Sequence, residues 1–165
     1  MRRIATAVSV VAVVLLSAGL FAQAGSNFSG KWEFDVAKNA EARAGTGRGT
    51  MGGRGASGPM IVEMDSKRVT FSRMGPDGTV RQTFMLDGSE TRNITMFRGR
   101  EVADISKASF RDGKLSINTA AGLARGGGEK LVSWYMIDAW LVNETEERTV
   151  AGNALKYYYK RVAAK

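Results

Sequence analysis

The chain has no cysteine and no histidine, and it contains only two prolines among 165 residues. The absence of cysteine and histidine excludes disulfide bonds, the common zinc sites, and serine–histidine or cysteine–histidine nucleophilic catalysis. The acidic residues Glu101 and Asp104 fall on opposite faces of one predicted strand, which argues against a glycosidase pair. We therefore expect no catalytic residue, no cofactor and no metal site, and a binding protein rather than an enzyme.

Acidic residues are also scarce relative to basic ones. Lysine and arginine total 24 against 16 aspartate and glutamate, so the formal net charge is +8. A basic balance favours partners such as anionic headgroups, polyanions or carboxylate ligands, although it also serves general solubility. No folded nucleic-acid-binding motif is present, so nucleic acid is not an expected partner.

Only one long hydrophobic run occurs, at the N-terminus. Arg2 and Arg3 precede an uncharged apolar run from Ile4 to Phe21, and Ala22-Gln23-Ala24 then supplies the small-x-small pattern of signal peptidase sites. An uncleaved anchor is the alternative, but Ala, Ser, Thr and Gly dilute the run and no positive cluster follows. We predict a signal peptide over residues 1–24 with cleavage after Ala24. Bacterial-type export would then make the protein periplasmic or secreted, with no membrane span after cleavage.

Residues 25–165 suit a single domain and consist of short strand patterns separated by turn signals. In the first strand, Phe28, Trp32 and Phe34 alternate with polar residues. Turn signals recur at Asp65-Ser66-Lys67, Pro76-Asp77-Gly78, Asp87-Gly88, Arg98-Gly99-Arg100 and Asp112-Gly113. The spacing predicts an all-β antiparallel meander of about eight to ten strands, closed into a small barrel or folded as a sandwich.

Residues 36–58 are predicted to form a long flexible loop after the first strand. Residues 36–43 could form one helical turn but have no apolar stripe, and residues 45–58 are rich in glycine and arginine with few large side chains. Such a segment cannot offset the entropy lost on ordering. It contains the string Gly47-x-Gly49-x-x-Gly52 without the strand and helix that a dinucleotide site needs, so we expect no nucleotide there.

The most apolar segment, Lys130–Val142, carries large apolar side chains on both faces. A half-buried strand needs only one apolar face, which leaves three explanations open. The strand bends within one core, its second face lines an apolar pocket, or that face meets another protein. For the pocket, the candidate ligand-binding residues are Trp134, Met136, Trp140, Tyr157 and Tyr159.

Several short motifs follow one another along the chain: Phe28-Ser29-Gly30-Lys31-Trp32, Ala37-Lys38-Asn39, Leu86-Asp87-Gly88, Trp140-Leu141-Val142 and Tyr159-Lys160-Arg161-Val162. The first resembles the start of exported bacterial lipocalin-like domains, and the later ones resemble motifs found in the same order in those proteins. The resemblance implies a lipocalin-like barrel, an export route and no settled activity. It also implies a barrel floor made by Gly30, Trp32 and Arg161, with the guanidinium of Arg161 stacked on the indole of Trp32.

Two hypotheses about function follow. The first is an exported, non-enzymatic protein that holds a small apolar or amphipathic molecule in its barrel, which requires a hollow interior. The alternative is an envelope-associated interaction module that binds anionic lipid or polysaccharide through its basic surface, which requires salt-sensitive binding. The sequence leaves the oligomeric state open.

Overall fold

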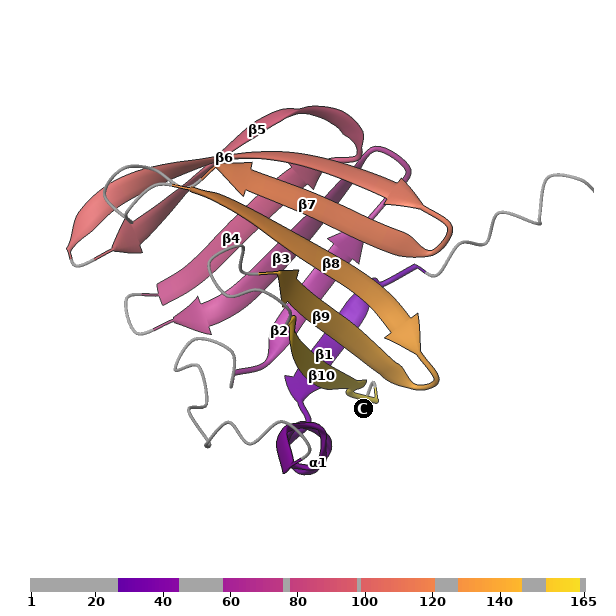
Figure 1. The fold of residues 1–165 in the computed structure, drawn as a ribbon. Helices are drawn as coiled ribbons and strands as arrows, with labels where there is room; N and C mark the ends of the chain where they lie inside the picture. Colours follow the sequence, from indigo (N-terminus) through magenta and orange to yellow (C-terminus); the bar gives the residue numbers. More distant parts are fainter. Residues whose placement is uncertain are drawn as a thin grey trace, which may run out of the picture.

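Ten antiparallel strands form one sheet that curls into a nearly closed barrel (Figure 1). The computed structural model describes residues 27–44, 58–75, 78–97, 99–120, 128–146 and 154–163, and within them it holds one helix besides the strands. The elements are β1 (Gly30–Phe34), α1 (Val36–Ala44), β2 (Met60–Met64), β3 (Arg68–Gly75), β4 (Gly78–Met85), β5 (Asp87–Phe97), β6 (Arg100–Arg111), β7 (Lys114–Ala120), β8 (Glu129–Ile137), β9 (Trp140–Glu146) and β10 (Leu155–Arg161). The strand order is β4-β3-β2-β1-β10-β9-β8-β7-β6-β5, which confirms the predicted antiparallel barrel. The predicted signal peptide lies outside the described residues.

Side chains alternate along each strand between the barrel interior and the outer surface. In β6, Val102, Asp104 and Ala108 are buried, whereas Glu101 and Lys107 are exposed. The period of two places one parity of each strand inside. The interior core consists of Phe28, Trp32, Met60, Val62, Val69, Phe71, Phe84, Ala108, Leu115, Ile117, Trp134, Leu141 and Tyr159.

The turn between β6 and β7 follows its sequence signal. Asp112 and Gly113 have φ angles of 51° and 75°, and a two-residue type I′ turn requires positive φ at both positions. The predicted hairpin across Asp65-Ser66-Lys67 is also confirmed, because β2 and β3 pair from Met60–Arg73 to Met64–Val69.

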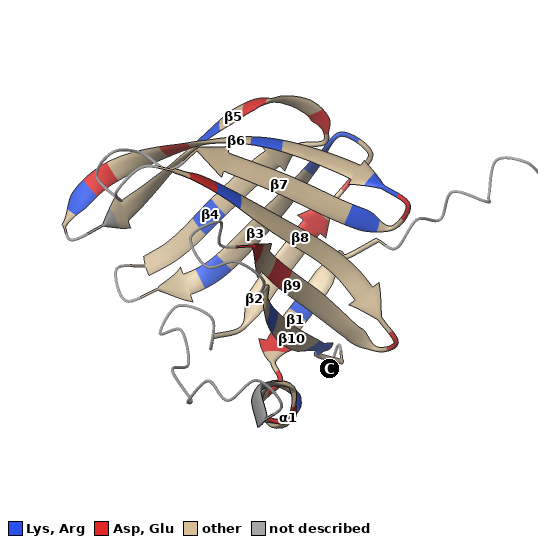
Figure 2. Ribbon diagram, in the orientation of Figure 1, with Lys and Arg blue, Asp and Glu red and all other residues tan. Residues whose placement is uncertain are grey.

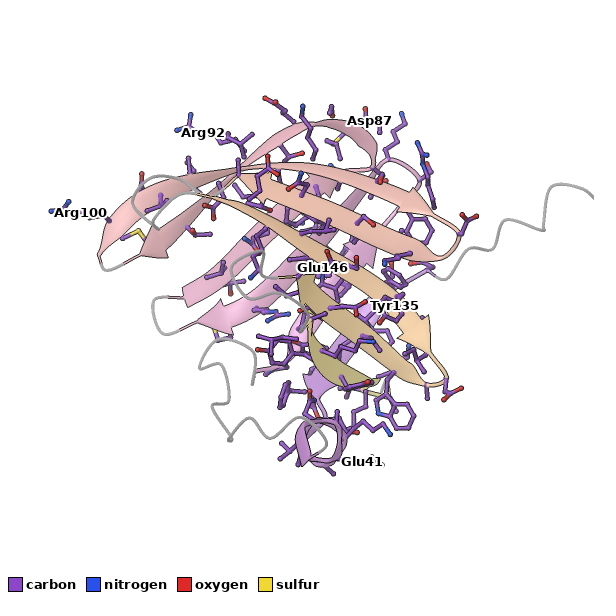
Figure 3. The ribbon with its side chains drawn as sticks, in the orientation of Figure 1. Glu41, Asp87, Arg92, Arg100, Tyr135 and Glu146 are labelled. Carbon is purple, nitrogen blue, oxygen red and sulfur yellow. The ribbon has the colours of Figure 1, made fainter. Side chains whose placement is uncertain are left out.

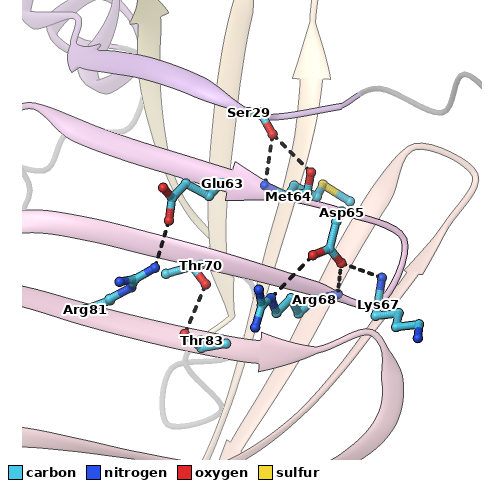
Figure 4. A network of polar contacts seen from close by, with 9 residues as sticks. All are labelled: Ser29, Glu63, Met64, Asp65, Lys67, Arg68, Thr70, Arg81 and Thr83. Carbon is cyan, nitrogen blue, oxygen red and sulfur yellow. Dashed lines mark hydrogen bonds and ion pairs between the residues drawn. The ribbon is translucent and has the colours of Figure 1, made fainter.

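Polar contacts surround the turn between β2 and β3 and join it to the residue before β1 (Figure 4). The Ser29 hydroxyl accepts a hydrogen bond from the Met64 amide at 2.9 Å and donates to the Met64 carbonyl at 3.2 Å. Asp65 Oδ1 accepts from the amides of Lys67 (2.8 Å) and Arg68 (2.9 Å), and these bonds hold the pKa of Asp65 below its ordinary value. Ser29 therefore extends the pairing of β1 with β2 beyond the strand itself.

The predicted strand Lys130–Val142 is wrong as a single strand. The chain reverses between β8 and β9 at Asp138-Ala139, where Asp138 has a φ of 52°. Two paired strands share one interior, which explains the large apolar side chains at both parities. Asp-Ala carries no glycine or proline, so the turn left no strong signal in the sequence.

The predicted Asp87-Gly88 hairpin is also wrong. β4 and β5 stand at opposite ends of the strand order, and Asp87 does not adopt positive φ. Side chains bridge the two strands instead: Asn93 accepts from the Thr83 amide and donates to the Thr83 carbonyl, both at 2.9 Å. Thr91 Oγ1 accepts from the Met85 amide at 3.2 Å. We call this boundary between β4 and β5 the seam.

The first nine residues of the predicted flexible loop form a helix instead, and residues 45–57 lie outside the described residues. Asp35 caps α1, because its Oδ1 accepts from the Lys38 amide at 3.0 Å. The Nε1–H of Trp140 donates to the other carboxylate oxygen at 3.2 Å. Both hydrogen bonds favour the charged carboxylate and lower the pKa of Asp35.

Asn39 attaches α1 to the barrel. This side chain is 2% exposed, and its Nδ2 donates to the carbonyls of Asp35 (2.7 Å) and Tyr158 (2.8 Å). Its Oδ1 accepts from the Tyr158 amide at 3.0 Å. The amide group therefore continues the hydrogen bonding of β10 where β1 ends, which gives the Ala37-Lys38-Asn39 motif a structural role.

Candidate functional site

A cavity of about 620 Å³ opens inside the barrel between the β3–β4 strands and β7 to β9. Its volume lies in the range of roughly 300–1,000 Å³ that is typical of small-molecule sites. The lining residues are Gly58, Phe71, Arg73, Met74, Gly75, Val80, Gln82, Phe84, Asp104, Ile117, Thr119, Lys130, Val132, Trp134, Asn143 and Thr145. Part of the interior is therefore open beside the packed core, as the first hypothesis requires.

The inner part of the cavity is aromatic and apolar. Trp134 stacks on Phe71 with ring centroids 4.8 Å apart and an interplanar angle of 27°, and Phe84 meets Phe71 edge-on at 6.1 Å. These three rings and Ile117 are buried in the core and also line the cavity. An apolar group can contact this surface without losing hydrogen bonds.

Charged and polar side chains face the same cavity from several strands. Arg73 comes from β3, Lys130 from β8 and Asp104 from β6, where Asp104 is 5% exposed. Asp104 faces inward and Glu101 outward, as the strand parity predicted. The cavity is therefore amphipathic, with two cationic residues and one acidic residue among its lining.

Arg73 is held in place by aromatic neighbours. Its Nη2 donates to Tyr159 Oη at 3.3 Å and to Met60 Sδ at 3.0 Å. The guanidinium carbon lies 5.4 Å from the Tyr159 ring centroid and 5.9 Å from that of Trp134. Burial raises the pKa of the Tyr159 hydroxyl, so this hydroxyl remains neutral at physiological pH. A cation fixed in this way beside an apolar wall can bind the acidic end of an amphipathic molecule.

The five candidate ligand-binding residues do not all meet at this cavity. Trp134 lines it, while Tyr159 belongs to the adjacent core and Met136 and Tyr157 pack against that core. Trp140 lies on the outer surface, where the Lys38 Nζ is 5.1 Å from its ring centroid.

The placement of Trp140 corrects the parity assumed for a single strand. The two-residue turn pairs Ile137 with Trp140 and Met136 with Leu141, so even-numbered residues point inward on β8 and outward on β9.

The sequence interpretation also missed Arg73, although Val69, Phe71 and Arg73 share one parity of β3. Because Arg73 continues the apolar face formed by Val69 and Phe71, the sequence could have indicated that its side chain points into the barrel.

The three predicted floor residues lie together. The guanidinium carbon of Arg161 is 4.6 Å from the Trp32 ring centroid, and the two residues are cross-strand partners. Gly30 has a φ of 143°, and a Cβ built there would lie 3.1 Å from Arg161 Nη1. The Nε1–H of Trp32 donates to the Phe28 carbonyl at 2.8 Å. None of these residues lines the cavity, and the contact between Trp32 and Arg161 joins β1 to β10.

The outer surface carries a polar cluster around Tyr135 (Figure 3). Its hydroxyl donates to Glu144 Oε2 at 3.0 Å, and Lys156 Nζ lies 3.3 Å from Glu144 Oε1. Burial and the neighbouring carboxylate raise the pKa of Tyr135. These contacts link β8, β9 and β10 across the sheet and contain no cavity-lining residue.

Within the described ranges, no helix has the length and hydrophobicity to span a membrane.

The barrel topology defines the fold class of small antiparallel barrels that includes the lipocalins and the fatty-acid-binding proteins. No protein-family model matches the sequence, and no curated protein sequence matches it either.

Solved structures share the fold at low sequence identity. A protein titled REP1-NXSQ fatty acid transporter superposes with a TM-score of 0.57 at 15% identity, covering 83% of this chain and 97% of that one. Apo lipid binding protein 8 of Caenorhabditis elegans gives 0.56 at 12% identity, covering 82% and 95%. Fatty-acid-binding protein 1 of Echinococcus granulosus gives 0.53 at 15%, covering 82% and 98%. Identities this low establish a similar fold alone.

Proposed function

We propose that the protein is an exported, non-enzymatic carrier that holds a small amphipathic molecule in the barrel cavity. The observation that supports this most directly is the amphipathic lining, with stacked aromatic rings beside the guanidinium of Arg73. The fold is also shared with proteins whose titles describe fatty acid transport or lipid binding. Export rests on the sequence of residues 1–24.

The ligand is proposed to place its apolar part against Trp134 and Phe71 and its acidic end near Arg73. The aromatic wall offers dispersion contacts, and the Arg73 guanidinium offers a positive charge with N–H donors for a carboxylate. Tyr159 contributes as a positioning residue, because its hydroxyl accepts from the guanidinium and holds it against the wall.

The test titrates the protein with 11-(dansylamino)undecanoic acid, a fluorescent carboxylate, and obtains the affinity from the directly excited dansyl emission. Trp134→Ala is expected to weaken binding because the ring that stacks on Phe71 is lost. Trp140→Phe is expected to leave the affinity unchanged because Trp140 lies outside the barrel. Arg73→Met is expected to weaken binding by about tenfold or more, since a hydrogen bond to a charged group contributes about 1.5–3 kcal/mol. Binding that is insensitive to both Trp134 and Arg73 would refute the proposed site.

Ligand identity and export are tested on protein expressed from the whole chain in its own host. Native mass spectrometry is expected to detect a co-purifying amphipathic molecule that is absent after denaturation. The same spectra report the N-terminus, which is expected to be Gly25 if the signal peptide is removed after Ala24. An intact Met1 terminus in secreted or periplasmic fractions would contradict cleavage.

A further inference from the structure

Charge alone does not define the ligand of the cavity. Figure 2 shows basic and acidic residues interspersed along the strands of the barrel. Inside the cavity, Arg73 and Lys130 likewise share the lining with Asp104. Neutral side chains that can form hydrogen bonds therefore carry the remaining information about the ligand, and two of them, Asn143 and Trp134, are almost fully buried in the lining.

The first neutral group is the amide of Asn143 on β9, which is 9% exposed. Its Oδ1 accepts a hydrogen bond from Thr145 Oγ1 at 3.4 Å, so the oxygen is turned toward Thr145 and Nδ2 is left as a donor. The other buried asparagines of the described chain, Asn39 and Asn93, donate through Nδ2 to backbone carbonyls. In the part of the chain that the structure describes, Nδ2 of Asn143 has no such acceptor.

The second neutral group is the indole of Trp134 on β8, which is 6% exposed. The indole N–H of Trp32 donates to the Phe28 carbonyl at 2.8 Å. That of Trp140 donates to Asp35 at 3.2 Å. The N–H of Trp134 has no acceptor among the described residues, and Trp134 is the tryptophan that lines the cavity. Since a buried indole N–H normally has a hydrogen-bond partner, this donor is available to a ligand.

The two donors lie side by side on the cavity wall. Trp134 and Asn143 are cross-strand partners, and their side chains begin about 4.5–5.5 Å apart, so one acceptor oxygen can reach both nitrogens. Neither nitrogen is fully enclosed, so each retains some surface toward the cavity that its residue lines. We call the Nε1–H of Trp134 and the Nδ2 of Asn143 the donor pair. The guanidinium carbon of Arg73 is 5.9 Å from the Trp134 ring centroid, so an acid held by Arg73 lies within a few bonds of the donor pair.

A plain hydrocarbon segment does not suit this part of the cavity. An alkyl chain excludes water from both donors and offers no acceptor in its place. A buried donor left without a partner costs more free energy than an average hydrogen bond contributes. A site with such donors therefore discriminates against a ligand that lacks the matching acceptor.

We propose that the donor pair binds a carbonyl oxygen of the ligand, so that the cargo is an acyl chain with this oxygen a few bonds from its acid group. This assignment deepens the proposed carrier function and rests on it, because Arg73 holds the acid in both. The aromatic wall of Phe71 and Phe84 contacts the remaining hydrocarbon. Simple saturated fatty acids, which carry no second oxygen-bearing group, bind more weakly.

The experiment compares tridecanoic acid with its 4-oxo, 6-oxo and 12-oxo derivatives, each of which adds one carbonyl oxygen to the same chain. The acids displace 11-(dansylamino)undecanoic acid from the protein, and the loss of dansyl emission gives each affinity. On the wild type, the tighter of the 4-oxo and 6-oxo acids is expected to bind about tenfold more tightly than tridecanoic acid, because two neutral hydrogen bonds are gained. The 12-oxo acid is expected to show no such gain, because its carbonyl is at the far end of the chain.

Variants of the donor pair test whether these two nitrogens cause the gain. Asn143→Leu keeps a similar volume and Trp134→Phe keeps an aromatic ring, and each is expected to lower the ratio of the two affinities from about tenfold to about threefold or less. Because the ratio is taken within one protein, a loss of packing that weakens both acids cancels. The matched controls are Asn118→Leu, at an exposed position on β7, and Trp140→Phe, outside the barrel. Both controls are expected to keep the wild-type ratio.

The outcomes separate this inference from the carrier function. Equal affinity of the wild type for tridecanoic acid and for the 4-oxo and 6-oxo acids would overturn the donor pair and leave the carrier function intact. An equal gain with the 12-oxo acid, or a ratio that survives in both Asn143→Leu and Trp134→Phe, would overturn the donor pair as well. If no acid displaces the fluorescent carboxylate, the carrier function fails and this inference fails with it. The comparison on the wild type decides the question even where a variant does not fold.

Discussion

The attachment of α1 to the barrel yields a quantitative prediction about Asn39. Asn39→Leu keeps a similar volume but removes three hydrogen bonds, two of which join the side chain to the backbone of Tyr158. Each bond contributes about 0.5–1.5 kcal/mol, and the Tyr158 amide loses the partner that the Asn39 side chain provides. We expect the free energy of unfolding to fall by about 3 kcal/mol, which corresponds to a Tm lower by roughly 6–12 °C.

Urea unfolding followed by circular dichroism measures this loss, together with a thermal scan. The control is Asn118→Leu, which places the same substitution at an exposed position on β7 and is expected to change stability by less than about 0.5 kcal/mol. A loss below about 1 kcal/mol for Asn39→Leu, with an unchanged dependence on urea, would show that water or backbone rearrangement replaces the Asn39 bonds. The reasoning about α1 would then be refuted.

Three further predictions concern the floor, the helix cap and the seam. Gly30→Ala forces a Cβ toward Arg161 at a φ of 143°, so the urea midpoint is expected to fall by the equivalent of about 1–3 kcal/mol; an unchanged midpoint contradicts the close approach. The folded pKa of Asp35 lies below 3.8, so its stabilisation is present above that pH and is lost as the pH falls through the folded value. Asp35→Asn is therefore expected to weaken the loss of stability in acid urea titrations, and an identical acid profile argues against the cap. Asn93→Val removes both hydrogen bonds to Thr83, so hydrogen exchange at the Thr83 amide is expected to accelerate, while unchanged protection would mean that the seam does not depend on Asn93.

Local sequence patterns predicted most of the strands because each pattern is decided by neighbouring residues. The alternation in β6 and the Asp112-Gly113 turn are examples, since parity and positive φ are local properties. Asp87-Gly88 carries the same local signal as Asp112-Gly113, yet the strands around it do not form a ladder. Pairing across the seam depends on how the whole sheet curls, which no short segment records.

The candidate site was predictable only in part for the same reason. Trp134 was identified because a large apolar residue on a strand has few other places to go. Trp140 was misplaced because one turn at Asp138 inverts the parity of every later residue in the hairpin. Arg73 was overlooked because an inward-facing arginine is meaningful only when the rings of Trp134 and Tyr159 are known to surround it.

The pairing of β1 with β10 has a consequence for biosynthesis. Trp32 and Arg161 are cross-strand partners, although they lie near opposite ends of the described chain. A chain made from its N-terminus therefore exposes the unpaired edge of β1 until β10 emerges, and bringing such distant strands together is slow. Unpaired edges recruit other strands, so the nascent chain is most prone to aggregate just before the barrel closes. A stop codon that removes only β10 would leave the edges of both β1 and β9 open and is expected to make the truncated sheet prone to aggregation.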